Sequence, residues 1–281
     1  MPSSDPGSRP RRPGPTVRLR VTEHRADGSR DREDRVVTEE PLELRLVWPG
    51  TDAHRVWVTM RTPGHDFELA AGWALHEGLC GPAGPHGVAY CTDRALAPEQ
   101  EFNVVTLTLD EEPASVPHQH DALSAGSGAC GVCGKDSLDA VLAARGGVPS
   151  WSGDLPSDEV VRTLPGRLRP GQRVFDRTGG AHAAALVDAD GKVLVVREDV
   201  GRHNAVDKVT GARLLRGESP SAAGLVVSGR AGFELVQKAL AAGIGSLVAV
   251  GAPTSLAVDL ARRGGLALHG FVRDDRAVRY A

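Results

Sequence analysis

The C-terminal hundred residues alternate between short apolar runs and amphipathic segments. The apolar runs predict strands at residues 183–188, 193–197, 224–228, 246–250 and 266–272. The segments between them have helical spacing and predict helices at residues 203–215, 233–242 and 254–262. Apolar runs without strict alternation are typical of strands that are buried on both faces. The pattern therefore predicts an α/β fold with a mixed sheet that carries helices on both faces.

The preceding part of the chain predicts a smaller α+β unit. Residues 54–61 are rich in β-branched side chains and predict a strand, as do residues 102–109. Asp66 is a candidate cap for a helix that reaches Gly78. Asp136 is a candidate cap for a second helix, which ends before Gly146.

The predicted domain organisation has three parts. Residues 1–35 are rich in Pro, Gly, Ser and Arg and poor in large apolar side chains, so we expect a disordered tail. Residues 36–150 form the N-terminal α+β part, and residues 151–281 form the α/β part. The segment 151–171 has the composition of a linker with a short helix.

Composition and charge narrow the class of protein. The chain has 281 residues, of which 41% are hydrophobic, and its 33 basic and 36 acidic side chains give a net charge of −3. This balance does not favour nucleic acid as a partner. No apolar run reaches the roughly 18 residues of a membrane span, and the N-terminus lacks an apolar signal core. We therefore expect a soluble cytoplasmic protein with no membrane association.

Four cysteines are too few for a disulfide scaffold in a chain of this length, so they are candidates for chemistry. Cys130 and Cys133 form a CxxC pair in a loop rich in glycine. The predicted helix start and Lys135 favour thiolate over thiol at this pair. Three interpretations compete: a structural zinc site, a thioredoxin-like redox site, and a sulfur carrier that holds a persulfide.

The residues around the pair weaken two of these interpretations. A structural zinc site normally has four ligands, and Cys80 and Cys91 do not form a second CxxC pair. We predict no metal site and interpret these two cysteines as small hydrophobic residues. A thioredoxin-like pair would follow an early strand, whereas this one lies in mid-chain. The His-x-Glu and Pro-Cys elements of zinc deaminases are also missing.

Small and basic residues follow the predicted strands, where ligands bind in open α/β sheets. Backbone N–H groups at helix starts and arginine side chains suit an anionic ligand such as phosphate. We call the predicted ligand site at these strand ends the crevice. Its candidate residues at the ends of the strands predicted at 224–228 and 246–250 are Ser228, Gly229, Arg230, Ala252, Pro253, Thr254 and Ser255. Arg273 and Arg276 follow the strand predicted at 266–272. Ordinary surface turns remain the alternative.

A highly polar run occupies residues 197–208, directly after a predicted strand. It is either a solvated helix start or a set of groups that face the same crevice. Arg202 and His203 of this run, and His182 before it, are candidate accessory residues of the crevice. For His182 an interior structural role is the alternative.

Taken together, these segments resemble the FdhD family, the sulfur carriers required for formate dehydrogenase activity. The resemblance extends from about residue 36 to the C-terminus. The matching segments are residues 62–72 (TPGHDFELAAG), 130–134 (CGVCG), 179–186 (GGAHAAAL), 197–208 (REDVGRHNAVDK), 228–238 (SGRAGFELVQK) and 252–257 (APTSLA). Gly232 and Gly251 depart from the family pattern, which commonly has serine at these positions.

The resemblance implies a fold similar to cytidine deaminase, a homodimer, and a persulfide received from a cysteine desulfurase. It implies that the sulfur passes to the molybdenum bis-guanine-dinucleotide cofactor of formate dehydrogenase, for which GDP is a mimic. Cys130 corresponds to the persulfide carrier and Cys133 to a second thiol. The implied dinucleotide site near the last strand comprises Phe271, Val272, Arg273, Asp274, Asp275 and Arg276. A cofactor chaperone without sulfur transfer and a thiol–disulfide oxidoreductase remain alternatives.

Overall fold

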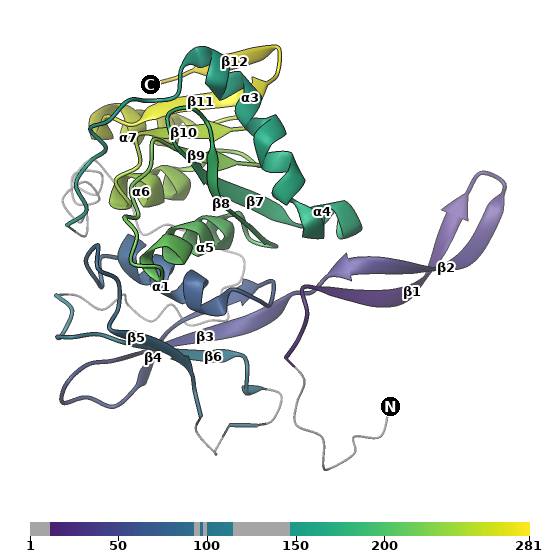
Figure 1. Ribbon diagram of the computed structural model, residues 1–281. Coiled ribbons are helices and arrows are strands. Elements are labelled where there is room, and N and C mark those ends of the chain that lie inside the picture. Colours follow the sequence, from purple (N-terminus) through teal and green to yellow (C-terminus); the bar gives the residue numbers. More distant parts are fainter. Residues whose placement is uncertain (1–11, 93–95, 98–99, 115–146) are drawn as a thin grey trace.

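The computed structural model describes residues 12–92, 96–97, 100–114 and 147–281 (Figure 1). The cysteine pair at Cys130 and Cys133 and the helix predicted after Asp136 lie outside the described residues.

The larger sheet has six strands in the order β12-β11-β10-β9-β7-β8. β9, β10 and β11 are parallel neighbours, whereas β7, β8 and β12 join as antiparallel strands. The sheet is therefore mixed, as predicted. Its strands are β7 (His182–Val187), β8 (Val193–Asp199), β9 (Gly224–Val227), β10 (Ser246–Ala249), β11 (Ala267–Arg273) and β12 (Arg276–Arg279).

Helices cover both faces of this sheet, which confirms that part of the fold prediction. They are α3 (Asp158–Leu168), α5 (Arg202–Leu214), α6 (Phe233–Ala241) and α7 (Ser255–Gly264). α3 packs on one face, against Ala183 and Ala185 of β7. The other three pack on the opposite face, where Ala184 and Leu186 point. Alternate residues of one strand thus enter different cores, which explains the continuous apolar run.

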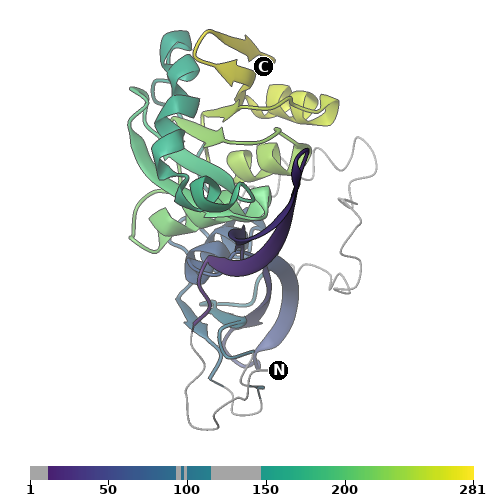
Figure 2. The same ribbon diagram turned by 90° about the vertical axis from the view of Figure 1, so that its right-hand side faces the viewer.

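The smaller sheet has four strands in the order β4-β3-β6-β5. Its strands are β3 (Glu40–Val47), β4 (His54–Arg61), β5 (Gly87–Tyr90) and β6 (Val104–Thr108). Helix α1 (Asp66–His76) covers one face of it, and Trp73 of this helix stacks on Trp57 of β4 at 5.2 Å between ring centroids. Figure 2 shows this N-terminal sheet below the C-terminal part, with helices between them.

The two parts meet where α1 crosses α5. Gly72 of α1 and Gly211 of α5 face each other at the crossing, so that the two backbones are in direct contact. A Cβ atom at Gly72 would overlap the carbonyl oxygen of Asp207, and one at Gly211 would overlap that of Glu68. Only glycine is compatible with this approach of the helices.

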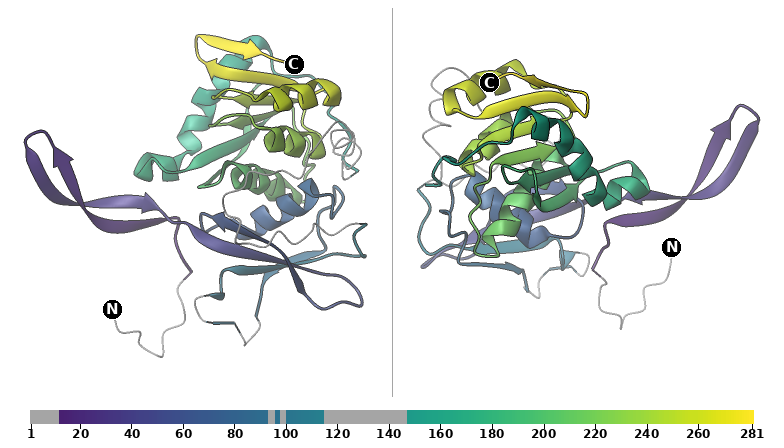
Figure 3. Two further views of the ribbon diagram at one scale, coloured as in Figure 1. Left: turned by 180° about the vertical axis from the view of Figure 1, so that it is seen from behind. Right: turned by 45° about the horizontal axis from the view of Figure 1, so that its top comes forward.

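The prediction of a disordered tail is wrong for residues 16–35. β1 (Thr16–Arg25) and β2 (Gly28–Val37) form a two-stranded antiparallel ribbon that projects from the body (Figures 1 and 3). Val17, Leu19 and Val21 alternate with polar residues, and an Asp-Gly turn signal follows. This is a hairpin pattern, and the high content of Arg, Gly and Pro obscured it.

The start of α1 also differs from the prediction. Asp66 is the first helical residue and not its cap, since its carboxylate accepts hydrogen bonds from Arg61 and Tyr90. The N-cap position belongs to His65, which has a φ of 60° and makes no side-chain capping bond. Further elements that we did not predict include β3 and β5 of the smaller sheet, η2 (Arg169–Gly171), α4 (Arg173–Thr178) and β12.

We expect Gly72→Ala to destabilise the protein by about 3 kcal/mol or more, because its methyl group forces two helix backbones apart. Urea unfolding provides the measurement. Gly166→Ala is the matched control: this glycine lies on an exposed part of α3, and a Cβ there would have Asp274 as its nearest neighbour at 3.7 Å. The control should leave the stability unchanged or raise it by up to about 1 kcal/mol. Equal effects of both substitutions would contradict the role of the crossing.

Candidate functional site

The carboxyl ends of β9, β10 and β11 meet at one edge of the larger sheet, and backbone hydrogen bonds join the loops that follow. Gly251 N–H donates to the carbonyl oxygen of Gly229 at 2.8 Å, and Phe271 N–H donates to that of Gly251 at 3.1 Å. Ala231 N–H donates to the carbonyl oxygen of Ala252 at 3.1 Å. The fold therefore brings together the three strand-end segments that the sequence predicted to form one site.

Phe271 is the most distinctive side chain at this edge. It has a φ of 52°, which is uncommon for a residue other than glycine, and it is 37% exposed. The guanidinium carbon of Arg276 lies 5.6 Å from its ring centroid, a cation–π distance. An exposed, fixed aromatic ring beside a guanidinium is a suitable surface for a planar heterocycle.

The residues that follow Phe271 differ in where their side chains lie and what they contact. Arg273 donates through Nη1 to the carbonyl oxygens of Val250 and Val272 at 2.8 and 2.7 Å, so it supports the loop after β10. The side chain of Val272 is fully buried in the core under α3, whereas Asp274 and Asp275 are exposed at the β11–β12 turn. We infer that only part of the predicted segment offers its side chains to a ligand.

The loop after β10 leads into α7. Thr254 is the N-cap of this helix, and its hydroxyl accepts a hydrogen bond from Ala257 N–H at 3.4 Å. Ser255 is the first helical residue, and both side chains are exposed. Ser228, after β9, has its hydroxyl bonded to Ala183 N–H at 2.9 Å, which ties β9 to β7. Of these three residues, Thr254 and Ser228 already have structural hydrogen bonds.

The three candidate accessory residues lie at the same edge, because β7 starts where β9 ends. His182 pairs with Asp199 across β7 and β8, and a Cβ atom at Gly229 would lie 3.4 Å from His182 Nδ1. Burial, with the positive charges of Arg202 and His203, lowers the pKa of His182. The interior structural role remains an alternative for this histidine.

Arg202 and His203 open α5 beside this histidine. His203 Nε2 lies 2.8 Å from a carboxylate oxygen of Glu234. Arg202 Nε is buried without a hydrogen-bond partner among the described residues. These two residues extend the polar character of the strand-end edge toward β8.

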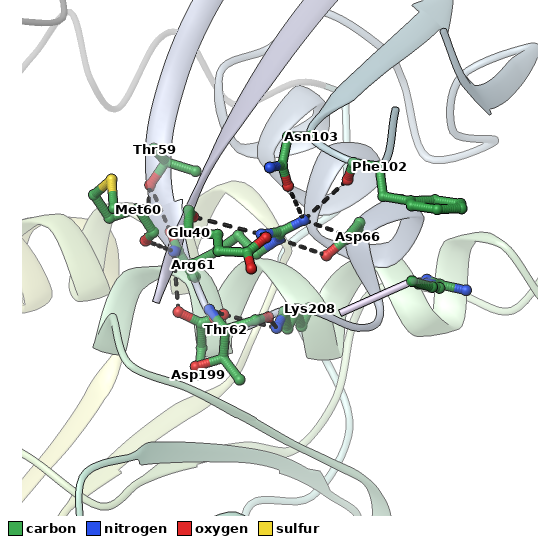
Figure 4. A network of polar contacts seen from close by, with 12 residues as sticks. Glu40, Thr59, Met60, Arg61, Thr62, Asp66, Phe102, Asn103, Asp199 and Lys208 are labelled. Atoms are coloured by element: carbon green, nitrogen blue, oxygen red, sulfur yellow. Dashed lines mark hydrogen bonds and ion pairs between the residues drawn. The ribbon is translucent and has the colours of Figure 1, made fainter. Parts of the chain in front are cut away.

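Much of the polar run 197–208 has a structural role. Asp199 accepts hydrogen bonds from Thr62 N–H at 3.1 Å and Gly201 N–H at 2.8 Å, and its carboxylate lies 2.7 Å from Lys208 Nζ. Lys208 also donates to the carbonyl oxygen of Thr62 at 2.9 Å (Figure 4). Both charged side chains are buried. The sequence predicted that this run is either a solvated helix start or a set of groups that face the crevice. Neither prediction included the buried contact of Asp199 and Lys208 with Thr62.

A second buried ion pair stabilises the N-terminal part. Arg61 contacts Asp66 through two hydrogen bonds of 3.0 and 3.2 Å and donates to Asn103 at 2.9 Å (Figure 4). Arg61 is fully buried and Asp66 is 1% exposed. A buried charge is tolerated when a charged partner and hydrogen bonds satisfy it. This network fixes the segment 62–64, which contacts Asp199.

The two described cysteines are free thiols. Burial raises the pKa of Cys80 to about 12, so this thiol stays protonated at neutral pH. The sulfur of Cys91 lies 3.7 Å from Arg45 Nη1, which donates to it. Cys80 packs against both main cores, in agreement with its interpretation as a hydrophobic residue.

Three further features of the described residues concern metal binding, membrane spans and cavities. No group of three or more His, Cys, Asp or Glu side chains in this part of the chain is arranged to hold a metal ion. Within the same residues, no helix is long and apolar enough to cross a membrane. A cavity of about 180 Å³ lies next to Trp151 and Gly265. It is close to the amino ends of β10 and β11, at the sheet edge opposite the candidate site.

Comparisons with known proteins identify the family of this chain. The model of the FdhD/NarQ family matches residues 37–281. The chain belongs to this family. It is 46% identical over 259 residues to the sulfur carrier protein FdhD of Corynebacterium efficiens, covering 89% of this chain and 90% of the relative. It is 45% identical over 271 residues to that of Streptomyces coelicolor, covering 95% and 94%.

A solved structure supports the fold. A crystal structure of a Desulfotalea psychrophila protein, described as a formate dehydrogenase accessory protein, matches with a TM-score of 0.70. It is 22% identical and covers 94% of this chain and 96% of its own. Family membership and the mixed α/β fold are thus confirmed, whereas the similarity to cytidine deaminase and the domain boundaries remain predictions.

Sequence reasoning missed the ion pair between Arg197 and Glu68, which also joins the two parts. Arg197 Nη2 donates to Glu68 at 2.6 Å, and His65 Nδ1 lies 3.1 Å from the same carboxylate. Burial alone would raise the pKa of Glu68, but the hydrogen bonds from Arg197 and His65 outweigh it and lower the pKa to about 2. The two charges are 129 positions apart, so no local signal reveals the pair.

This pair predicts an acid-sensitive contribution to stability. Because the folded-state pKa of Glu68 lies below its ordinary value of 4.5, its contribution is present above pH 4.5 and is lost as the pH falls toward 2. Glu68→Gln should lower the stability at pH 7 by on the order of 3 kcal/mol and flatten the acid limb of the profile. Urea unfolding at several pH values tests this. Glu39→Gln, at an exposed position, is the control; an unchanged acid limb in Glu68→Gln would refute the assignment.

Proposed function

We propose that this protein carries sulfur as a persulfide on Cys130, from a cysteine desulfurase to the molybdenum bis-guanine-dinucleotide cofactor of formate dehydrogenase. The main support is the family match over residues 37–281, together with relatives that are named sulfur carrier proteins. In this proposal the protein works in the cytoplasm as a homodimer. The cofactor is its substrate and leaves with the sulfur.

The loading step is a thiol exchange at a sulfane sulfur. The Cys130 thiolate attacks the terminal sulfur of the donor persulfide, and a new S–S bond forms. The S–S bond of the donor breaks, and the desulfurase cysteine leaves as a thiolate. One bond forms and one breaks, so the step needs no external oxidant or reductant.

The second thiol supplies the electrons for release. The Cys133 thiolate attacks the sulfur atom of Cys130, forms a disulfide with it and expels the terminal sulfur as hydrosulfide. The two cysteine thiols are oxidised by two electrons in total, and the sulfane sulfur is reduced by two. The hydrosulfide would then replace an oxygen ligand of molybdenum, with uptake of one proton from solvent and release of water. A cellular dithiol must reduce the disulfide before the next cycle.

The strand-end edge is the proposed cofactor site. Phe271 offers an exposed ring for the guanine, and Arg276 lies against that ring. The exposed Arg230 and the loop before α7 are suited to the diphosphate, because guanidinium and backbone N–H groups bind phosphate oxygens. Gly229 and Gly251 let neighbouring residues of the site pack closely, because a Cβ atom would lie 3.4 Å from His182 Nδ1 and 3.0 Å from the backbone of Arg230, respectively.

Two other functions would use the same residues. A cofactor chaperone would bind the dinucleotide while its cysteines only stabilise a loop. A thiol–disulfide oxidoreductase would cycle Cys130 and Cys133 without carrying sulfur. No described contact favours either of them over the sulfur carrier.

Mass spectrometry separates these functions. After incubation with a desulfurase and cysteine, a carrier gains about 32 Da on the peptide that contains Cys130, whereas an oxidoreductase loses about 2 Da. We expect Cys130→Ala to abolish this gain and the activation of formate dehydrogenase. Cys133→Ala should still load sulfur but release it slowly. Full activation of formate dehydrogenase by Cys130→Ala would disprove the carrier role.

GDP binding gives a complementary prediction. Phe271→Ala should weaken GDP binding at least about fivefold, since the loss of aromatic stacking costs roughly 1–3 kcal/mol per base. The variant should load sulfur at Cys130 at the normal rate. Cys130→Ala should bind GDP like the wild type, so the two variants lose different steps. Calorimetric titration with GDP measures binding; unchanged affinity in Phe271→Ala would exclude this guanine site.

A further inference from the structure

The ribbon formed by β1 and β2, which we call the arm, lies almost entirely before the residues 37–281 that match the family model. It projects from the body, and its base lies next to α4 (Figures 1 and 3). A pocket of about 320 Å³, which we call the arm pocket, lies between the arm and α4. It is lined by Arg18, Glu33, Asp34 and Arg35 of the arm and by Arg177 of α4. The arm pocket shares no residue with the candidate cofactor site.

Positive charges are concentrated at the arm pocket. Arg18 and Arg35 are directly opposite each other in the antiparallel pairing of β1 and β2. Residues paired in this way point to the same face of a ribbon, and like charges at such positions repel each other. Arg177 brings a third guanidinium to the pocket from α4. This repulsion is relieved when an anion lies among the three side chains.

The two carboxylates of the pocket compensate only part of this charge. Glu33 lies 3.7 Å from Arg18. Asp34 lies 3.1 Å from Arg32, and it accepts a hydrogen bond from the backbone N–H of Arg35 at 2.9 Å. Each carboxylate therefore already has an arginine partner, and neither forms an ion pair with the guanidinium of Arg35.

Two guanidinium groups remain without a counter-charge. Within the described ranges, the side chains of Arg35 and Arg177 have no hydrogen-bond or ion-pair partner. A guanidinium presents paired N–H donors that match the oxygen atoms of a phosphate group. A phosphate group carries about two negative charges at neutral pH, which balances two guanidinium groups, whereas a single carboxylate would balance one.

We propose that the arm pocket binds a phosphate group between Arg35 and Arg177. Among the described residues, no apolar side chain lines the pocket, so it offers no surface to a base or another hydrophobic group. The ligand is therefore free phosphate or diphosphate, or a small polar molecule that carries a phosphate group.

A phosphate group in this position connects the arm to the body. Arg35 belongs to the arm, whereas Arg177 belongs to α4. The backbone N–H groups of Val174 and Phe175 in α4 donate to the carboxylate of Glu198 in β8 at 2.7 and 2.8 Å, which fixes α4 to the larger sheet. A two-stranded ribbon has little stability on its own in water. Binding therefore stabilises the arm, and the stability of the arm reports binding.

Hydrogen exchange measured by mass spectrometry tests this connection. Pyrophosphate should slow the exchange of the backbone amides of β1 and β2, because it holds the arm against α4. Arg177→Gln should abolish this protection, although the substitution lies outside the arm. Arg216→Gln, at an exposed position after α5, is the control and should retain it. Sodium chloride at the same ionic strength should give no protection, which separates binding from the screening of repulsion.

Calorimetric titration with pyrophosphate measures the affinity. Arg35→Gln and Arg177→Gln should each weaken binding about tenfold, since each removes a hydrogen-bonded charge from the ligand. Arg177→Lys keeps the charge without the paired donors and should cause a smaller loss. Arg35→Gln also removes the repulsion with Arg18. Without pyrophosphate, exchange in the arm of this variant should therefore be no faster than in the wild type, which excludes an unfolded arm as the cause.

The candidate cofactor site also suits phosphate groups, so the titrations are made with Arg230→Gln protein, which lacks a guanidinium of that site. This variant should keep the protection of the arm by pyrophosphate. Arg35→Gln and Arg177→Gln should bind GDP and load sulfur at Cys130 like the wild type. Inorganic phosphate and glycerol phosphate, titrated in the same way, show whether the pocket prefers a free or an esterified phosphate group.

Three outcomes would overturn the proposal. They are an arm that pyrophosphate does not protect, equal protection by sodium chloride, and full protection in Arg177→Gln. The proposal does not rest on sulfur transfer. If sulfur loading at Cys130 fails while pyrophosphate still protects the arm, the proposed function is wrong and the arm pocket stands.

Discussion

The direct backbone contact between α1 and α5 is the constraint on which the arrangement of the protein depends. Two glycines, Gly72 and Gly211, let the helices approach until side chains no longer separate them. α1 packs in the core of the smaller sheet and α5 in the core of the larger sheet. The crossing therefore fixes the position of one sheet relative to the other. A methyl group on either glycine would collide with main-chain atoms, which cannot rotate away as a side chain can.

Buried charges surround this crossing and connect its two sides. Lys208 of α5 binds Asp199 and the carbonyl oxygen of Thr62, while Arg197 of β8 binds Glu68 of α1. A third cluster joins His76 of α1 to Asp207, which also binds Lys238 at 2.7 Å. Burial of an ion costs several kcal/mol unless a partner compensates it. These pairs add specificity, since a different packing of the sheets would leave a charge buried without a partner.

The same contacts have a consequence for the candidate site. Asp199 receives a hydrogen bond from Gly201 N–H and thereby holds the turn that precedes Arg202 and His203. The loops after β9, β10 and β11 are joined to one another by main-chain hydrogen bonds. The strand-end edge is therefore preorganised by the backbone, and residues such as Phe271 and Arg230 remain exposed for a ligand. In the proposed function, binding of the cofactor at this edge requires little ordering of the protein.

Local patterns in the chain were sufficient for the helices and strands from His182 to Arg273, since continuous apolar runs and helical spacing report burial directly, but they did not reveal the exposed strand β12. They also placed the candidate site at the strand ends, because parallel strands end at a common edge. They did not reveal the role of Asp199, Lys208 and Arg197. The partners of these side chains are more than a hundred positions away in the sequence, at Thr62 and Glu68. A charged run has the same composition whether it meets water, a ligand or a buried counter-charge. The packing of α1 on α5 decides among these possibilities, because it removes the run from water and supplies its partners.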